Sequence, residues 1–433
     1  MENILARAIQ AAEDAEVFFT SSEETSVHFE TNRLKQLQTS QQTGVALRVI
    51  EDGRIGYATA TGLGDAESLV ATALETARFG TPVRFELPAT DSLPGVEIFD
   101  AGVETVSNET MIKLGEELIA PVIKHTPDII CEAGVTRGTV TVRIINSRGG
   151  QANYRKSFFY LGVEGSLIRD TDMLFVGESE SSCHPISDSR AVAELVVRQL
   201  ELARHRATVE SKSLPVVFTP NGVASSLIMP LMSAFNGKTV LEGASPLGER
   251  LGERVFDSKL SLRDDPLVAY RPGSRPCDDE GVPSQRTGLI TEGTVTGFLY
   301  DLQTAGLAGK RSTGNGSRGR GGLPSPSPSA FIITPGETTL EEMVGDMKEG
   351  LVVEQVMGAE QGNILGGDFS GNVLLGYKVE NGKITGRVKD TMISGNVYQI
   401  LEKVEAIGRD ARWVGNFLLT PPVYCSGLSV ASK

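Results

Sequence analysis

The sequence predicts an α+β fold, with an N-terminal α+β region of antiparallel sheets and flanking helices, followed by a β-rich C-terminal domain. Three observations predict this fold. Short segments of alternating apolar and polar residues recur along the chain and are separated by turn residues, which is typical of antiparallel strands. Glycine supplies 48 of the 433 residues, about 11% against a usual 7%, and this excess indicates many tight turns. Segments with apolar residues at helical spacing flank the predicted strands.

The first 80 residues are predicted to form one α+β subdomain. Residues 2–14 carry apolar side chains at helical spacing and indicate an opening amphipathic helix. From Glu16 to Ala60 the pattern changes to short alternating segments. Asp52-Gly53 is a strong hairpin signal there, because glycine accepts the positive φ that such a turn demands. A second helix is expected from Asp65 to Gly80, where the glycine ends it.

A second α+β subdomain is predicted over residues 108–210, after a proline-containing linker over residues 81–107. Its order of elements repeats that of the first subdomain. The expected elements are a helix over about 109–124, strands over about 128–176 with turns at Arg137-Gly138 and Arg148-Gly149-Gly150, and a helix over about 188–205.

Residues 211–433 are predicted to form the β-rich domain. A strand over 215–219 leads to an apolar helix near 221–235, and residues 236–330 are rich in glycine, serine and proline. The prolines between 324 and 329 favour an extended path. The remaining expected elements are a short helix over 340–349, a hairpin turn at Asn381-Gly382, and an alternating strand over 423–430 of the kind found at an edge or closing position.

Charge and hydropathy exclude several classes of function. The 41 Lys and Arg residues against 55 Asp and Glu residues give a net charge of −14. This is the wrong sign for broad contact with a nucleic-acid backbone, so no direct nucleic-acid partner is expected. No stretch approaches the roughly 18 apolar residues of a membrane span, and the N-terminus lacks a secretory pattern. Four widely spaced cysteines favour reduced thiols, so we expect a cytoplasmic protein that does not contact membranes.

Motifs that carry chemistry are few. Residues 314–319 fit G-x-G-x-x-G, but no apolar strand enters the motif and no helix can follow it. We therefore reject a dinucleotide site and expect a loop whose backbone amides contact a ligand. Residues 277–280 look like a hard-cation cluster, although an acidic loop is more often solvated. The four histidines are scattered, and no nucleophile motif is present, so the residues alone predict no catalytic residue and no metal site.

The C-terminal half resembles the TldD/PmbA family, also called TldE or "modulator of DNA gyrase". The stretch from Thr43 to Ala60 resembles the first domain of the same family, so the resemblance covers nearly the whole chain. The C-terminal segments that carry it are Gly281-Val282-Pro283-Ser284-Gln285-Arg286-Thr287, Gly297-Phe298-Leu299-Tyr300-Asp301, Ser312-Thr313-Gly314-Asn315-Gly316, Thr334-Pro335-Gly336, Gly366-Gly367-Asp368, residues 376–383 and Ile393-Ser394-Gly395-Asn396.

The resemblance implies a dimer around a cleft that accepts peptides. In the TldD branch, a helix with H-E-x-x-x-H and a distant cysteine hold zinc, and the glutamate acts as general base. The corresponding helix here, near residues 221–235, has no His, Glu or Asp, and Cys425 does not match the position of the ligand cysteine. The chain therefore resembles the metal-free PmbA/TldE branch, and zinc is expected only in a TldD-like partner.

The favoured hypothesis is a non-catalytic subunit that completes the cleft of a TldD/TldE-type metalloprotease, as a heterodimer with a TldD-like protein or as a homodimer. The resemblance implies extended or unfolded peptides as substrates, held in part by strand addition. The alternatives are a homodimeric peptidase with an unrecognised site and a regulatory binding protein that acts on DNA gyrase. Arg286 and Asp301 can equally form a surface ion pair, and the loop glycines can simply satisfy turn geometry. The residues predicted at the cleft or interface are Arg286, Asp301, Ser312, Gly314, Asn315 and Gly316.

Overall fold

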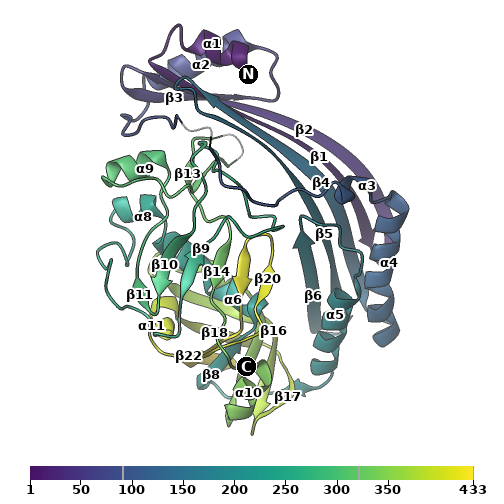
Figure 1. The fold of residues 1–433 in the computed structure, drawn as a ribbon. Helices are drawn as coiled ribbons and strands as arrows, with labels where there is room; N and C mark the ends of the chain where they lie inside the picture. Colours follow the sequence, from purple (N-terminus) through teal and green to yellow (C-terminus); the bar gives the residue numbers. More distant parts are fainter. Residues whose placement is uncertain (90–91, 320–321, 433) are drawn as a thin grey trace.

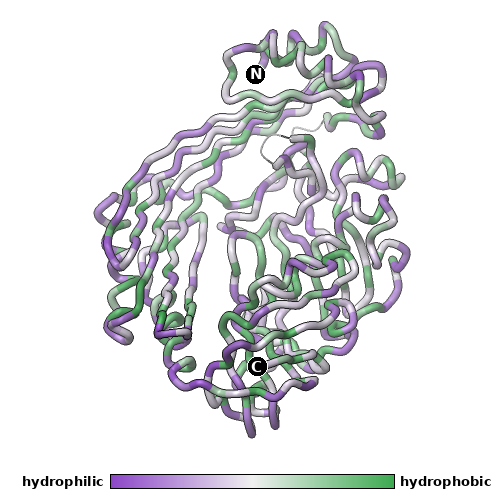
Figure 2. The backbone as a smooth tube through the Cα atoms, turned by 180° about the vertical axis from the view of Figure 1, so that it is seen from behind, coloured by the Kyte–Doolittle hydropathy of each residue, from purple (hydrophilic) through white to green (hydrophobic). Residues whose placement is uncertain are grey.

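The computed structural model describes residues 1–89, 92–319 and 322–432. The predicted α+β fold is confirmed: a long antiparallel sheet from the N-terminal half arches along one side of a β-rich C-terminal domain (Figure 1). Seen from behind and coloured by hydropathy, the long strands of the arch carry both hydrophilic and hydrophobic residues (Figure 2). No helix within the described ranges is long and apolar enough to cross a bilayer.

The arch is a six-stranded sheet with the order β3-β2-β1-β4-β5-β6. β1 pairs with β2 on one side and with β4 on the other along most of its length. The segments 1–80 and 108–210, which the sequence analysis treats as separate subdomains, therefore contribute to one sheet. The strands are β1 (Asp14–Glu30), β2 (Arg33–Glu51), β3 (Arg54–Ala60), β4 (Ile130–Asn146), β5 (Gln151–Arg169) and β6 (Asp172–Ser182).

Helices cover only one face of this sheet. Along β1, the odd-numbered residues Val17 and Val27 pack against helices, in two separate hydrophobic clusters. The even-numbered residues of β1, beginning with Glu16, point to the opposite face because side chains alternate along a strand. That opposite face is turned toward the C-terminal domain. The helices of this half are α1 (Glu2–Ala8), α2 (Ala66–Ala77), α3 (Gly102–Thr105), α4 (Asn108–His125) and α5 (Arg190–Leu202).

The C-terminal domain consists of two packed sheets around the largest hydrophobic cluster. The larger sheet has the order β15-β8-β22-β18-β16-β17-β7, and β15 also pairs with β16, so part of it closes on itself. Its strands are β7 (Arg206–Ala207), β8 (Lys212–Phe218), β15 (Glu349–Met357), β16 (Asp368–Glu380), β17 (Lys383–Val388), β18 (Thr391–Asn396) and β22 (Val423–Ser432), with β19 (Val404–Ile407) paired to β22.

The second C-terminal sheet has the order β11-β10-β9-β14-β21-β20, and a two-stranded ribbon, β12-β13, accompanies it. The strands are β9 (Leu262–Asp264), β10 (Thr287–Thr291), β11 (Thr294–Val295), β12 (Gly316–Ser317), β13 (Ser325–Pro326), β14 (Phe331–Ile333), β20 (Arg412–Val414) and β21 (Leu418–Thr420). The helices of the domain are α6 (Pro220–Ser226), α7 (Ile228–Ala234), α8 (Gly237–Leu241), α9 (Leu302–Leu307), α10 (Leu340–Asp346) and α11 (Val397–Glu402), and a short 3-10 helix, η1, spans Ala359–Gln361.

Three local predictions are wrong, each for a physical reason. The opening helix stops at Ala8 instead of continuing to residue 14, because the chain already turns into β1. Arg137-Gly138 is not a turn: Gly138 lies in the middle of β4, where a side chain would sit 2.5 Å from the Phe158 ring. Of the two positions expected for the strand over 423–430, edge or closing, the edge position is wrong, because β22 lies between β8 and β18.

A buried charge network joins the arch to the C-terminal domain. Arg48 lies opposite Glu16 in the β1–β2 register, and their side chains form a 2.9 Å contact. Arg48 also donates to Glu280 of the C-terminal domain at 2.5 Å. Arg318, from the glycine-rich loop, donates to the second carboxylate oxygen of Glu16. All four side chains are buried, so two guanidinium groups and two carboxylates neutralise each other away from water.

The surroundings of the network stabilise the charged form of Arg48. Burial by itself would lower the pKa of Arg48, but Glu16 and Glu280 more than offset this effect and raise the pKa above its ordinary value. The face of the Arg48 guanidinium lies 4.7 Å from the centre of the Phe85 ring, and Arg318 lies 5.5 Å from that of Phe18. Aromatic faces attract such cations, so the network is enclosed by carboxylates and rings.

Arg48→Ala is expected to lower the free energy of unfolding by about 3–5 kcal/mol, because it leaves Glu16 and Glu280 buried without their shared cation. Arg143→Ala is the matched control: it removes an exposed pair with Glu2 and should cost at most about 1 kcal/mol. Urea unfolding at neutral pH measures both values. Equal losses for the two variants would show that the buried network does not hold the arch in place.

Candidate functional site

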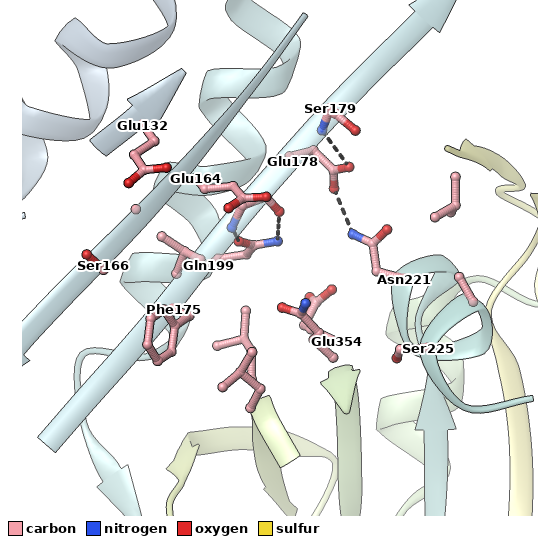
Figure 3. Close-up of a pocket in the computed structure, with 18 of the residues that line it drawn as sticks. Glu132, Glu164, Ser166, Phe175, Glu178, Ser179, Gln199, Asn221, Ser225 and Glu354 are labelled. Carbon is pink, nitrogen blue, oxygen red and sulfur yellow. Dashed lines mark hydrogen bonds between the residues drawn. The ribbon is translucent and has the colours of Figure 1, made fainter. Parts of the chain in front are cut away.

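A cleft of about 590 Å³ lies where the end of the arch meets the C-terminal domain (Figure 3). One wall comes from β4, β5 and β6 together with Gln199 of α5. The other wall comes from α6, β15 and β16. The cleft therefore brings together side chains that are far apart in the sequence, and it forms only where the two halves of the chain meet.

The edge of the six-stranded sheet borders this cleft. β6 pairs only with β5 in that sheet, so its other side presents main-chain groups. Gln199 binds two of them with its side-chain amide: Gly177 N donates to Gln199 Oε1 at 2.9 Å, and Gln199 Nε2 donates to Gly177 O at 3.2 Å. An amide thus occupies, at Gly177, the place that a further strand would take.

Two carboxylates face each other across the sheet within the cleft. Glu132 on β4 and Glu164 on β5 are register partners, and both side chains are exposed. Like charges directly opposite in a sheet are destabilising. Neither residue forms an ion pair with any residue in the described part of the chain. The pair gives this wall of the cleft an uncompensated negative charge.

Two further carboxylates project into the cleft from opposite sides (Figure 3). Glu178, beside the edge glycine, contacts Arg412 at 2.9 Å and accepts a 3.2 Å hydrogen bond from Asn221 of α6. Glu354 on β15 accepts from the hydroxyl of Thr219 at 2.9 Å. Burial raises the pKa of Glu354, nearby Glu178 adds to the shift, and the Thr219 hydrogen bond opposes it.

The helix in which the resemblance places zinc ligands is now seen as two short helices, α6 and α7, broken at Leu227. Thr219 caps α6, and the apolar residues Val223, Ile228 and Leu231 are buried in the core. Neither helix carries a His, Glu or Asp. Within the described ranges no three or more His, Cys, Asp or Glu residues are grouped so that they could hold a metal ion. The residues of this chain do not fit a zinc site there.

The predicted site residues Arg286 and Asp301 do not pair with each other. Arg286 Nε contacts Asp265 at 2.8 Å, and its side chain is 67% exposed. Asp301 is buried and caps α9, accepting from both the amide and the hydroxyl of Thr304. The surface ion pair that the sequence left open as an alternative is therefore not formed, because the carboxylate of Asp301 caps a helix.

The other four predicted residues lie together in a loop that packs on the chain itself. Ser312 Oγ donates to Tyr300 O and accepts from Gly314 N. Gly314 has a φ of +73°, and a side chain on Gly316 would lie 2.5 Å from a Glu280 oxygen. Asn315 is buried and donates to Asp264 at 2.7 Å. These contacts give each residue a part in the fold, and none of the four lines the cleft at β6.

For residues 277–280 the sequence suggested either a cation cluster or a solvated acidic loop. The structure shows neither. Asp278 is buried and accepts from the amides of Glu280, Val282 and Gly316. Burial raises the pKa of Asp278 to about 8, the neighbouring carboxylate of Glu280 contributes to this shift, and Arg275 with the amide donors opposes it. Backbone amides of the glycine-rich loop thus donate to carboxylates of the same chain. The sequence analysis expected these amides to contact a ligand instead.

Sequence reasoning missed the residues that line the cleft. Glu132, Glu164, Gln199 and Glu354 belong to no motif, and each comes from a different element. The sequence pattern that could have indicated the cleft is the position of Glu132 and Glu164 within strands of alternating polarity. It becomes informative only when the β4–β5 register shows that the two carboxylates are opposite each other.

Comparisons with known proteins agree on one family. The family model described as PmbA/TldA metallopeptidase C-terminal domain matches residues 211–432, and the one described as PmbA/TldA metallopeptidase domain 1 matches residues 15–77. An uncharacterised protein of Methanocaldococcus jannaschii is 29% identical, over 96% of this chain and 95% of that protein. A protein of Haemophilus influenzae named metalloprotease PmbA homolog is 27% identical, over 93% of this chain and 89% of that protein.

Solved structures show the same fold. The crystal structure of TldE from Thermococcus kodakarensis has a TM-score of 0.90 and 22% sequence identity, and all of both chains is covered. A protein of Thermotoga maritima described as a putative modulator of a DNA gyrase has a TM-score of 0.89 and 24% identity, with 99% of each chain covered. These similarities support the arrangement of arch and C-terminal domain described above.

Glu354→Gln is expected to raise the free energy of unfolding at neutral pH and to leave it unchanged near pH 4. The pKa of Glu354 is raised in the folded protein, so ionising this carboxyl costs more in the folded than in the unfolded chain. That cost is absent below the ordinary glutamate pKa of about 4, grows as pH rises through the raised pKa and persists above it. Urea unfolding at about pH 4, 6 and 8 measures the difference.

The control is Glu116→Gln, a change on the exposed side of α4, which should shift stability little at any pH. If Glu354→Gln increased the free energy of unfolding equally at the lowest and the highest pH, the result would contradict the burial of this carboxyl.

Proposed function

The chain belongs to the PmbA/TldD metallopeptidase family, and on this premise we propose that it is a non-catalytic subunit whose cleft binds extended peptides for proteolysis by a partner. The observation that carries the proposal is the amide of Gln199 on the edge of β6. The cleft already binds one amide group through the two hydrogen bonds that a peptide main chain would use.

The charge of the cleft indicates which peptides it favours. Glu132 and Glu164 lie opposite each other and pair with no cation among the described residues, a local conflict that costs stability and is typical of a functional site. A lysine or arginine side chain of a bound peptide would relieve it. Strand addition gives affinity for any extended main chain, and this carboxylate pair adds a preference for basic side chains.

The non-catalytic role rests on the residues of α6 and α7. Zinc peptidases need His, Glu or Asp ligands and a general base, and these helices contain none of them. We therefore assign the metal and the hydrolytic step to a TldD-like partner. The alternative partner to be tested is a second copy of this chain. The similarity to a metalloprotease PmbA homolog over nearly the full length supports placing this subunit in such a system.

Gln199→Ala should strengthen the binding of an extended peptide roughly fivefold. The variant removes the amide that a peptide must displace from Gly177, a contribution of about 1 kcal/mol. Fluorescence anisotropy with a labelled, unstructured, lysine-rich peptide measures the dissociation constant. Gln36→Ala is the control, because Gln36 is exposed and bonds only to neighbouring Gln38. Unchanged or weaker binding by Gln199→Ala would exclude the β6 edge as the peptide path.

The chain purified alone without chelator should hold close to zero zinc and should not cleave peptides. Elemental mass spectrometry measures the metal, and a fluorogenic peptide assay measures cleavage. Adding a zinc-loaded TldD-type protein should produce cleavage that exceeds that of the added protein alone. About one tightly held zinc per chain, or peptidase activity of the chain by itself, would contradict the non-catalytic assignment.

A further inference from the structure

A second, larger cavity lies under the arch, between its concave face and the glycine-rich loop. We infer that this cavity binds the C-terminal carboxylate of the peptide, with Lys156 as its cation. The inference rests on the proposed function and adds a second anchor to it. The cavity has a volume of about 1330 Å³, enough for more than a single small ion. None of the four carboxylates of the β6 cleft lines it.

The walls of this cavity combine apolar side chains with hydroxyl groups that can bind an oxygen-rich group. Hydroxyl side chains of β1, β2 and β3 line one side, and Ser317 and Ser329 line the other. The hydroxyl of Ser329 is buried and has no hydrogen-bond partner in the described part of the chain. Buried polar atoms are nearly always paired, so Ser329 gives this wall a hydroxyl that the described part of the chain does not use.

Lys156 differs from the other cations of the cavity because they are paired with carboxylates. Arg318 is neutralised by Glu16, and Arg275 pairs with Asp279 at 3.4 Å. The ammonium of Lys156 donates only to carbonyl oxygens, those of Pro272 and Ser274. It forms no ion pair with any acid at the described positions. Among the described residues that line the cavity, Lys156 is thus the cation without an ion pair, which matches a monoanion such as a carboxylate.

The surroundings of Lys156 favour an incoming anion. Its side chain is enclosed on most sides and keeps part of its surface toward the cavity. Burial lowers the pKa of Lys156 and nearby Arg275 adds to this shift, while Cys183 and Asp279 oppose it. Ammonium–carboxylate hydrogen bonds in such surroundings are about twice as strong as those between neutral groups.

The position of Lys156 relative to the β6 cleft fits an extended peptide. Lys156 and Glu164 both lie on β5, eight residues apart, and an even spacing places them on the same face of the sheet. Eight residues of strand span roughly 27 Å. A peptide of about eight residues is therefore long enough to span the distance between Glu164 and Lys156.

The test compares two nine-residue, lysine-containing peptides that differ only in a free or an amidated C-terminus. Their binding to the full-length chain is measured by fluorescence anisotropy. We expect the free acid to bind about tenfold more tightly than the amide. In Lys156→Gln this preference should vanish while the affinity for the amidated peptide stays the same. Lys113→Gln, on the exposed side of α4, should keep the full preference.

The outcomes separate the inference from the proposed function. If neither peptide binds, the proposed function itself is wrong. If both bind equally well to the unmodified chain, peptide binding stands and the carboxylate site is overturned, whether or not Lys156→Gln folds. A preference that persists in Lys156→Gln would place the carboxylate elsewhere. Competition by inorganic phosphate at concentrations where acetate has no effect would also overturn the inference, in favour of a dianion site.

Discussion

The arrangement of the molecule depends on four buried charges. Glu16 and Arg48 belong to the arch, Glu280 and Arg318 belong to the C-terminal domain, and each arch residue contacts a residue of the other half. A buried charge that loses its partner is far more costly than an exposed one. The network therefore fixes how the concave face of the sheet is set against the C-terminal loops. Both cavities lie along that face, so their shape depends on this contact.

The two halves of the chain contribute different chemistry to the site. The arch supplies a strand edge and an unbalanced pair of carboxylates, and the C-terminal domain supplies polar groups from Thr219, Asn221 and Arg412 that hold Glu354 and Glu178 in place. Glu132 and Glu164 differ from these residues, because both are exposed and neither forms an ion pair within the part of the chain that the structure describes. Binding and catalysis can be divided between subunits in this way, because strand addition requires no catalytic side chain.

Local signals predicted local structure, and long-range contacts could not be predicted from them. The hairpins at Asp52-Gly53 and Asn381-Gly382 and the helix that Asp65 caps are confirmed, because each depends on a few neighbouring residues. The lengths of β1 and β2 were missed because their central residues are polar on both faces. The acidic residues at 278–280 appeared solvated in the sequence because the cation that pairs with Glu280, Arg48, is 232 residues away along the chain. The cleft likewise depends on sheet register, which no motif records.

The sequence separations within the charge network have a consequence for how the protein is made. Glu16 meets Arg318 across 302 residues, whereas the last strand of the arch is complete at Ser182. At usual rates of synthesis, roughly 7 to 27 seconds pass between the emergence of residue 182 and that of residue 318. During this interval the nascent arch can form its own hydrogen bonds, but Val142 and Ile144 on its concave face are in water until Cys277 packs against them. Neither cavity exists until the second half of the chain has left the ribosome.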